Sequence, residues 1–355
     1  MSKPPTIREV AKRAGVSVAT VSRVMNGRGS VSERTRHTVG EAIRDTGFRP
    51  NVIGRGLKTA RSGTLGVLVP SLRNPIFADV VQGIERAAEA GGYRILLTSS
   101  NYLPSKEVTA IDVLLCNRVE GLVLTVADES SSQALEFLDR SNVPFVLVFN
   151  PAQCAKHSIV TIDNFAAARD IVSRLVRMGH RRIAMIAGDS EASDRSNLRR
   201  AGYEQALTDG GLRPGPIIEV SFDSRVLERH CRALLSCDPS PTALFCSTDM
   251  LAIGAIRGLA ALRLKVPDDI SVVGFDGIEV GRCMSPSLAT VVQPAEEMGA
   301  RAVEHLLERL NSGTPATSMT LPYRLRHGES WAKPAREDDR TERDSGAATK
   351  GTIHL

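Results

Sequence analysis

Residues 18 to 23 carry side chains that could contact the edges of DNA bases. Arg23 can donate two parallel hydrogen bonds to a guanine, while Val18 and Ala19 can make apolar contact, as with a thymine methyl group. Thr20 and Ser22 carry hydroxyls, which bind phosphate oxygens or cap helices and so give register rather than sequence. This chemistry requires one exposed helix that presents these side chains together.

Two short helices joined by a tight turn would position that segment. Thr6 and Glu9 form a capping box, and the apolar residues that follow repeat at helical spacing as far as Gly15, which ends the first helix. Ser17 can cap the second helix, and a third helix starts at the Ser32 cap. This order is that of a helix-turn-helix, whose second helix enters the major groove. Spacing alone also allows an ordinary corner of a three-helix bundle.

Charge is unevenly distributed along the 355 residues. Residues 1–61 hold 13 Lys and Arg against 4 Asp and Glu, a net +9, and the remaining residues hold 32 against 36, a net −4. A basic head on a mildly acidic body suits contact of the head with phosphates. Because no segment approaches the ~20 apolar residues of a membrane span and no signal peptide begins the chain, we expect a cytoplasmic protein without membrane contact.

From Thr64 onward, short apolar runs alternate with longer amphipathic patterns. Ten such runs, several almost wholly apolar, indicate buried strands of parallel sheets, and the helical patterns between them predict a doubly wound α/β body. Ten strands exceed one six-stranded unit, so we predict two lobes. Doubly wound sheets bind ligands at the carboxyl ends of their strands, where polar residues follow several of the runs.

The sequence shows none of the residue constellations that enzymes use. It lacks a nucleophile elbow, a Walker loop and a zinc-protease motif, and its seven histidines are scattered. The six cysteines form no C-x-x-C pair and have no histidine partner at zinc spacing. We therefore expect a ligand-binding protein without catalysis, cofactor or metal.

The stretches AGVSVATVSRVMNG, VSERTR and GFRPN resemble the head of the lactose-repressor (LacI/GalR) family of bacterial transcription regulators, and the resemblance continues to about residue 332. It implies a helix-turn-helix domain at 1–48, a hinge at 49–63, and a ligand-binding and dimerisation domain at 64–332. That last domain would have the type I periplasmic-binding-protein fold.

Within that fold the chain would cross between the lobes three times. The expected lobes are residues 64–162 with 292–322, and residues 163–291 with 323–332. The tail at 333–355 is polar and aperiodic, so we expect disorder. Because it lacks the leucine heptads of a tetramer helix, we predict a homodimer.

By this resemblance, Arg23 occupies one of the family's main base-contacting positions, together with Val18 and Ala19. The hinge would form a helix that pairs with its dimer mate in the minor groove, where Leu57 would insert between central base pairs. Two glycines weaken that helix, which predicts folding only on DNA; the alternative is a plain flexible linker. The DNA-contacting residues that we expect are Thr6, Ser17, Val18, Ala19, Thr20, Ser22, Arg23, Asn26, Asn51, Ile53 and Leu57.

The resemblance also marks residues that follow strand ends as ligand contacts. Arg199 matches the family's ligand-gripping arginine, Asp276 its recurrent acceptor for hydroxyls, and Phe222 an aromatic that stacks on the ligand. Asp249 follows a threonine where the family commonly has asparagine, and Asn150 also departs from the family pattern. Without the family, a core aromatic and solvated loop carboxylates would explain such residues as well. The expected ligand-binding set is Asn74, Ile76, Phe77, Asn150, Asp163, Arg195, Arg199, Phe222, Asp249 and Asp276.

Acids and an arginine around an aromatic floor suit a polyol, and a second arginine suits a sugar acid. The phrases VPSLRNPIFADV and VGFDGIEVGR resemble the gluconate-type members of the family. We therefore predict a dimeric, sequence-specific DNA-binding regulator, a repressor of genes for sugar or sugar-acid uptake and catabolism. A small effector, a sugar or a sugar acid, would bind between the lobes and control affinity for a palindromic operator on double-stranded DNA. The alternative is a solute-binding protein or an α/β enzyme with an unrelated basic tail.

Overall fold

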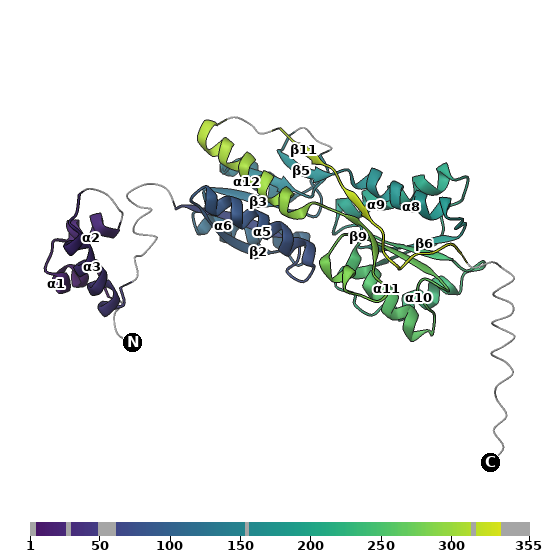
Figure 1. Cartoon of the computed structure of the whole chain (residues 1–355). Helices are drawn as coiled ribbons and strands as arrows, with labels where there is room; N and C mark the ends of the chain where they lie inside the picture. The colour runs from purple at the N-terminus through teal and green to yellow at the C-terminus, as the bar shows by residue number, and fades with distance from the viewer. Residues whose placement is uncertain (1–4, 26–29, 49–61, 153–155, 314–316, 335–355) are drawn as a thin grey trace, which may run out of the picture. The chain divides into compact units, whose positions relative to one another are not determined.

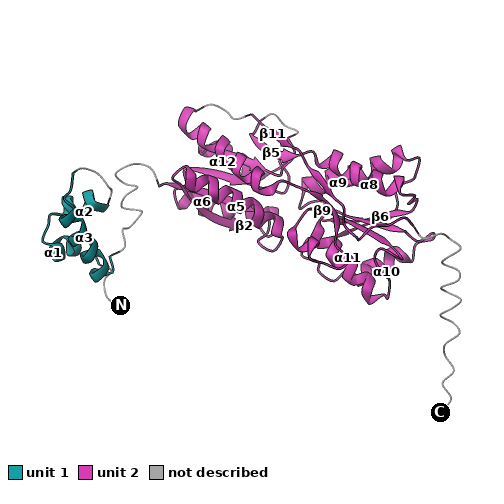
Figure 2. Cartoon of the chain, in the orientation of Figure 1, with its two compact units in different colours: residues 1–62 teal, residues 63–355 magenta. Residues whose placement is uncertain are grey.

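The computed structural model describes residues 5–25, 30–48, 62–152, 156–313 and 317–334 (Figure 1). Two compact units make up the chain: residues 1–62, hereafter the head, and residues 63–355, hereafter the body (Figure 2). The predictions about the hinge over 49–61 and about the tail from residue 335 concern positions outside the described residues. No helix among the described residues is long and apolar enough to cross a membrane.

The described residues of the head form three helices. These are α1 (Ile7–Ala14), α2 (Val18–Met25) and α3 (Glu33–Thr46). The N–H of Thr6 donates to the Glu9 carboxylate at 2.7 Å, and Gly15 ends α1 in the left-handed conformation at φ 65°. Each helix contributes buried side chains to one small core, which includes Val10, Val21 and Val39. The predicted order of three helices is confirmed.

A six-stranded parallel sheet forms the first lobe of the body. Its spatial order is β11 (Met319–Leu321), β5 (Ile159–Ile162), β4 (Phe145–Val148), β3 (Gly121–Leu124), β1 (Thr64–Val69) and β2 (Arg94–Ser99). The helices of this lobe are α5 (Pro75–Ala90), α6 (Pro104–Cys116), α7 (Gln133–Ser141) and α12 (Ala295–Ser312).

A second six-stranded sheet forms the second lobe. Its spatial order is β12 (Arg324–Arg326), β10 (Ala289–Val292), β9 (Ser271–Asp276), β8 (Ala243–Cys246), β6 (Ile183–Gly188) and β7 (Ile217–Val220). All neighbours are parallel except β12, which runs antiparallel to β10. The helices are α8 (Asn164–Arg177), α9 (Asp194–Asp209), α10 (Glu228–Leu235), α11 (Asp249–Ala261) and the 3-10 helix η1 (Glu279–Arg282).

The chain passes between the two sheets three times. It leaves the first sheet after β5, returns after β10 to form α12 and β11, and crosses again to β12. The two-lobed, doubly wound α/β fold is thus confirmed, and the ten predicted strands correspond to β1 through β10. The two strands of three residues, β11 and β12, were not predicted.

Two helix pairs lie so close that each needs a glycine at its contact. A Cβ on Gly83 of α5 would lie 1.9 Å from the carbonyl oxygen of Glu296 on α12. A Cβ on Gly202 of α9 would lie 2.3 Å from the carbonyl oxygen of Phe165 on α8. Because real Cβ atoms do not approach oxygens so closely, these glycines set the spacing of the helices that cover both sheets.

Candidate DNA-contacting face and ligand pocket

One side of α2 presents the residues that the sequence assigns to base contact. Val18 is 41% exposed, Ala19 and Arg23 are also exposed, and Val21 on the opposite side is fully buried in the head core. Positions i, i+1 and i+5 of a helix lie on one face, so these side chains can meet one surface together. Ser22 lies on the same face and is half-buried.

The hydroxyl residues at the start of α2 are engaged with one another. The Ser17 and Thr20 hydroxyls lie 2.9 Å apart, and the Thr20 N–H donates to the Ser17 hydroxyl at 3.1 Å. This local bonding caps the helix, as the sequence suggested. Thr6 caps α1, and the other predicted DNA-contacting residues, Asn26, Asn51, Ile53 and Leu57, lie outside the described residues.

The body contains a pocket where the carboxyl ends of strands from both lobes meet. The first lobe contributes residues that follow β1, β2 and β4, and the second lobe contributes α9 and residues that end or follow β7, β8, β9 and β10. This is the position that a doubly wound sheet offers to a ligand. The lining residues are Asn74, Ile76, Phe77, Tyr102, Phe149, Ser193, Arg195, Arg199, Phe222, Thr248, Asp276 and Gln293.

Asp276, which ends β9, is the only acidic side chain among the described residues that line this pocket. Its carboxylate accepts from Gln293 Nε2 at 2.9 Å, from Arg199 Nη1 at 3.3 Å and from Asn74 Nδ2 at 3.3 Å. Asn74 belongs to the first lobe, so this carboxylate joins the lobes directly. Burial raises the pKa of Asp276, and the positive charge of Arg199 opposes that rise.

Arg199 also lines the pocket and is 5% exposed. Its Nε donates to Asn164 Oδ1 at 2.9 Å, and its Nη1 donates to the carbonyl of Ser247 at 2.6 Å as well as to Asp276. The guanidinium carbon lies 3.7 Å above the ring of Phe275. Burial lowers the pKa of Arg199 to about 10, so the side chain stays charged at neutral pH.

Four aromatic rings also line the pocket and contact one another. Phe77 meets Tyr102 and Phe149 edge to face, with ring centroids 6.2 and 5.6 Å apart. Tyr102 of the first lobe stacks on Phe222 of the second, with centroids 4.4 Å apart and planes 15° from parallel. These rings offer an apolar surface for a ring or a sugar face, in addition to the charged groups.

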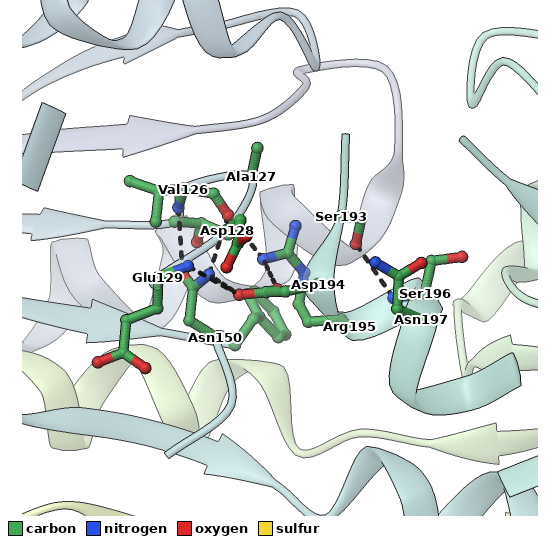
Figure 3. Close-up of polar contacts among 12 residues, drawn as sticks. Val126, Ala127, Asp128, Glu129, Asn150, Ser193, Asp194, Arg195, Ser196 and Asn197 are labelled. Atoms are coloured by element: carbon green, nitrogen blue, oxygen red, sulfur yellow. Dashed lines mark hydrogen bonds and ion pairs between the residues drawn. The ribbon is translucent and has the colours of Figure 1, made fainter. Parts of the chain in front are cut away.

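A second set of contacts joins the lobes at the start of α9 (Figure 3). The Asp194 carboxylate accepts from the Asn150 amide at 2.8 Å and from the Glu129 N–H at 3.2 Å, both in the first lobe. Arg195 pairs with Asp194 at 2.9 Å, and the same Nη1 donates across the lobes to the carbonyl of Val126 at 2.8 Å. We call this set the α9 latch.

Seven of the ten predicted ligand residues line the pocket, and three lie elsewhere. Asn150 is fully buried in the α9 latch, where its amide also pairs with the main chain of Val126 at 2.9 and 3.1 Å. Asp163 is exposed and caps α8 through the N–H of Ala166 at 2.8 Å. Asp249 is fully buried and accepts two successive N–H groups of the turn after β9.

Five lining residues were not in the predicted set: Tyr102, Phe149, Ser193, Thr248 and Gln293. Gln293 directly follows β10, so the rule that ligands meet strand ends could have found it. Its Oε1 is buried and has no hydrogen-bond partner among the described residues, which leaves an acceptor free for a donor from a ligand. Tyr102 and Phe149 have left-handed backbone conformations, with φ 57° and 71°, which the sequence does not signal.

Two family models match the chain. Residues 6–51 match a model described as "Bacterial regulatory proteins, lacI family", and residues 62–325 match "Periplasmic binding proteins and sugar binding domain of LacI family". Together they cover both the head and the body.

Individual relatives are similar over nearly the whole chain. Catabolite control protein A of Priestia megaterium is 36% identical over 330 residues, which cover 92% of this chain and 98% of that protein. The HTH-type transcriptional regulator GntR of Escherichia coli (strain K12) is 34% identical over 321 residues, which cover 89% and 95%. A solved structure of the lac repressor dimer bound to operator and the anti-inducer ONPF aligns with a TM-score of 0.80 at 30% identity, covering 93% of this chain and all of that one.

Proposed function

This chain belongs to the lacI family of bacterial regulatory proteins, and we propose that its operator affinity is controlled by a sugar acid bound between the two lobes. Like its relatives, it is a DNA-binding transcriptional regulator. The observation that carries the proposal is the buried pocket of Arg199, Asp276 and four aromatic rings, to which both lobes contribute.

On DNA, two heads of a homodimer would bind the halves of a near-palindrome, since two-fold protein symmetry imposes that arrangement. The exposed face of α2 would enter the major groove, with Arg23 on a guanine and Val18 against a base edge. A solved relative is a dimer bound to operator, which supports this reading of the head. We assign the protein to the cytoplasm because its target is bacterial DNA.

The arginines of the pocket suit an acidic ligand. Two buried arginines, Arg195 and Arg199, line it; Asp276 pairs with Arg199, and Asp194, outside the lining, pairs with Arg195. A carboxylate ligand could accept hydrogen bonds from the guanidinium groups, and hydroxyls could donate to the free Oε1 of Gln293. The aromatic rings would hold the carbon face of the ligand. None of these groups forms a reactive pair, so we propose binding without catalysis.

Coupling to DNA would arise from the relative position of the lobes. A ligand that prefers one lobe arrangement shifts the equilibrium toward it, and the head would respond through the hinge. The proposal includes repression of uptake or catabolism genes. Either sign of coupling, with the ligand as inducer or as corepressor, is compatible with this pocket.

Selection of bound fragments from the host genome tests the proposal. The purified full-length protein is presented with sheared genomic DNA at physiological salt, without ligand, with pooled neutral sugars and with pooled sugar acids. We expect one near-palindromic sequence to be enriched, and its enrichment to change with the sugar-acid pool. If no sequence is enriched under any condition, the DNA-binding proposal fails; if only neutral sugars change the enrichment, the ligand class is wrong.

A further inference from the structure

Asp249, at the start of α11, has both carboxylate oxygens occupied by protein donors. Oδ2 accepts from the N–H of Gly277 at 2.8 Å and from the N–H of Ile278 at 2.9 Å. Oδ1 accepts from the hydroxyl of Thr290 on β10. The side chain is fully buried and does not line the pocket. Asp249 therefore binds the turn that follows β9 rather than the space beyond it.

Arg326, on the last strand, binds the same turn from the other side. Its Nη1 donates to the carbonyl of Gly277 at 3.3 Å, its Nη2 to the carbonyl of Ile278 at 3.1 Å, and its Nε to the carbonyl of Leu288 at 3.3 Å. Its guanidinium also lies 3.9 Å from Asp249 Oδ2. Asp249 thus holds the N–H groups of residues 277 and 278, and Arg326 holds their carbonyl groups.

The turn has a conformation that the backbone does not favour by itself. Asp276 has φ 130° and Gly277 has φ 83°, both in the region where L side chains are strained. A Cβ at residue 277 would lie 2.6 Å from Cα of Val292, so any other residue would force the main chain there to shift. Such a conformation persists only where surrounding groups hold it, and Asp249 and Arg326 supply those groups.

We propose that Asp249 and Arg326 are positioning residues that fix the turn 276–278 and thereby aim the Asp276 carboxylate into the pocket. The proposal rests on the proposed function in taking Asp276 as a ligand acceptor. The sequence predicted that Asp249 contacts the ligand directly; we propose instead that Asp249 acts on the ligand site through Asp276. The sequence suggested no role for Arg326. Because Arg326 lies just past the third crossing between the lobes, it also ties that crossing to the ligand site.

Amide hydrogen exchange of the ligand-free, full-length protein tests whether Asp249 and Arg326 hold the turn 276–278. In Asp249→Ala we expect the Gly277 and Ile278 amides to exchange at least about tenfold faster, with the strands on either side unchanged. Asp249→Asn is the matched control, since its amide oxygen can still accept both N–H groups; there we expect a change below about threefold. Unchanged exchange in Asp249→Ala would overturn the proposal.

Arg326→Gln provides an independent variant in case Asp249→Ala does not fold. Its shorter side chain cannot reach three carbonyl groups, so we expect faster exchange at the same turn. If exchange there stays as in the unchanged protein, Arg326 does not hold the turn and that half of the proposal is wrong.

A double-mutant cycle with D-gluconate as the probe separates positioning from a general structural role. We expect Asp249→Ala to weaken gluconate binding about tenfold in the unchanged background but less than about twofold in an Asp276→Asn background. Equal losses in the two backgrounds would mean that Asp249 does not act through Asp276. If gluconate does not bind the unchanged protein, gluconate is not the effector. The pooled sugar acids then test the ligand class, and the exchange experiment still decides the role of Asp249.

Discussion

At the scale of single residues, the two pocket arginines have different partners. Arg199 bonds within the second lobe, to Asn164, Ser247 and Asp276, while Arg195 reaches across to Val126 of the first lobe. We therefore assign Arg199 to holding the ligand and Arg195 to joining the lobes. The first assignment can be tested without disturbing the second.

Arg199→Ala should abolish the response to effector while leaving effector-free operator affinity within about twofold. The loss removes charge-assisted hydrogen bonds worth about 1.5–3 kcal/mol each and leaves Asp276 without its cation. Measuring operator affinity at increasing effector concentrations gives the size of this response. Arg200→Ala is the matched control, because Arg200 is half-exposed and pairs with Glu204 and Glu219. A normal response in Arg199→Ala would exclude Arg199 from the ligand site.

Arg23→Ala should weaken operator binding by about 1–3 kcal/mol and flatten the preference at one base pair in each half-site. Binding to a panel of single-base operator variants measures both effects. Arg13→Ala is the control, because Arg13 lies on α1 and pairs with Asp45, so any loss there should be equal across the panel. Full selectivity in Arg23→Ala would exclude Arg23 from base contact.

Glu107 should make the body less stable as pH rises toward neutrality. Its carboxylate is 3% exposed and accepts the N–H of Ala127 at 2.7 Å. Burial raises its pKa to about 7, although the Ala127 bond and nearby Arg195 oppose the rise. Because this folded pKa exceeds the unfolded value, the stability is complete below ~pH 4.3 and is lost as pH rises through about 7.

Denaturation across pH 4 to 8 checks this prediction. Glu107→Gln should remove up to about 3 kcal/mol of pH dependence in the free energy of unfolding. Glu89→Gln, at an exposed position of α5, should leave the profile unchanged. The assignment to Glu107 fails if the Glu107→Gln profile keeps the full slope.

At the scale of elements, the close packing of α5 on α12 is a point of sensitivity. Gly83→Ala gains about 1 kcal/mol of helix propensity, but its Cβ would overlap the main chain of Glu296. We expect a net destabilisation of about 1–3 kcal/mol in urea denaturation. Gln82→Ala, at the exposed neighbouring position, should be neutral or slightly stabilising. A Gly83→Ala protein as stable as the unchanged one would mean that α12 can move away at little cost.

The elements also show how far the sequence could predict the fold. Ten strands were predictable because each contains an apolar run. Most of these runs are buried on both faces, as in GLVL and ALFC, while those of the edge strands β2 and β7 are only partly buried. The strands MTL and RLR were not predictable, since they are short and partly exposed, and RLR is charged at both ends. Their place at sheet edges comes from tertiary pairing, which no local pattern records.

The sequence could predict those pocket residues whose place in the pocket follows from their position at a strand end. Residues at or shortly after strand ends, such as Asp276 at the end of β9 and Asn74 between β1 and α5, line the pocket as the rule for doubly wound sheets requires. The rule cannot say which way a side chain turns. Asp249 and Asn150 also follow strands, yet both point into hydrogen-bond networks of the main chain beside the pocket.

At the scale of the whole molecule, contacts made by protein groups alone hold the two lobes together. The α9 latch and the bond between Asn74 and Asp276 both bridge the lobes. The closed arrangement therefore has its own stabilising contacts, which a ligand would strengthen or replace.

Asp194→Ala should open the ligand-free body. It removes the acceptor for Asn150 and Glu129, so small-angle X-ray scattering should show a larger radius of gyration, with faster amide exchange over residues 126–129. Asp209→Ala at the far end of α9, where the aspartate pairs with Arg169, should change neither. Scattering and exchange identical to those of the unchanged protein would show that the α9 latch does not hold the lobes.

The stack of Tyr102 on Phe222 has a consequence for the speed of ligand capture. With ring centroids 4.4 Å apart, the two faces touch, and nothing can enter between them until the rings separate. If the ligand enters between these rings, capture waits for a motion of the protein, so the observed rate should level off as ligand concentration increases, at the frequency with which the rings part. The same motion would govern escape, and a regulator built this way would respond to lasting supplies of its effector and ignore brief ones.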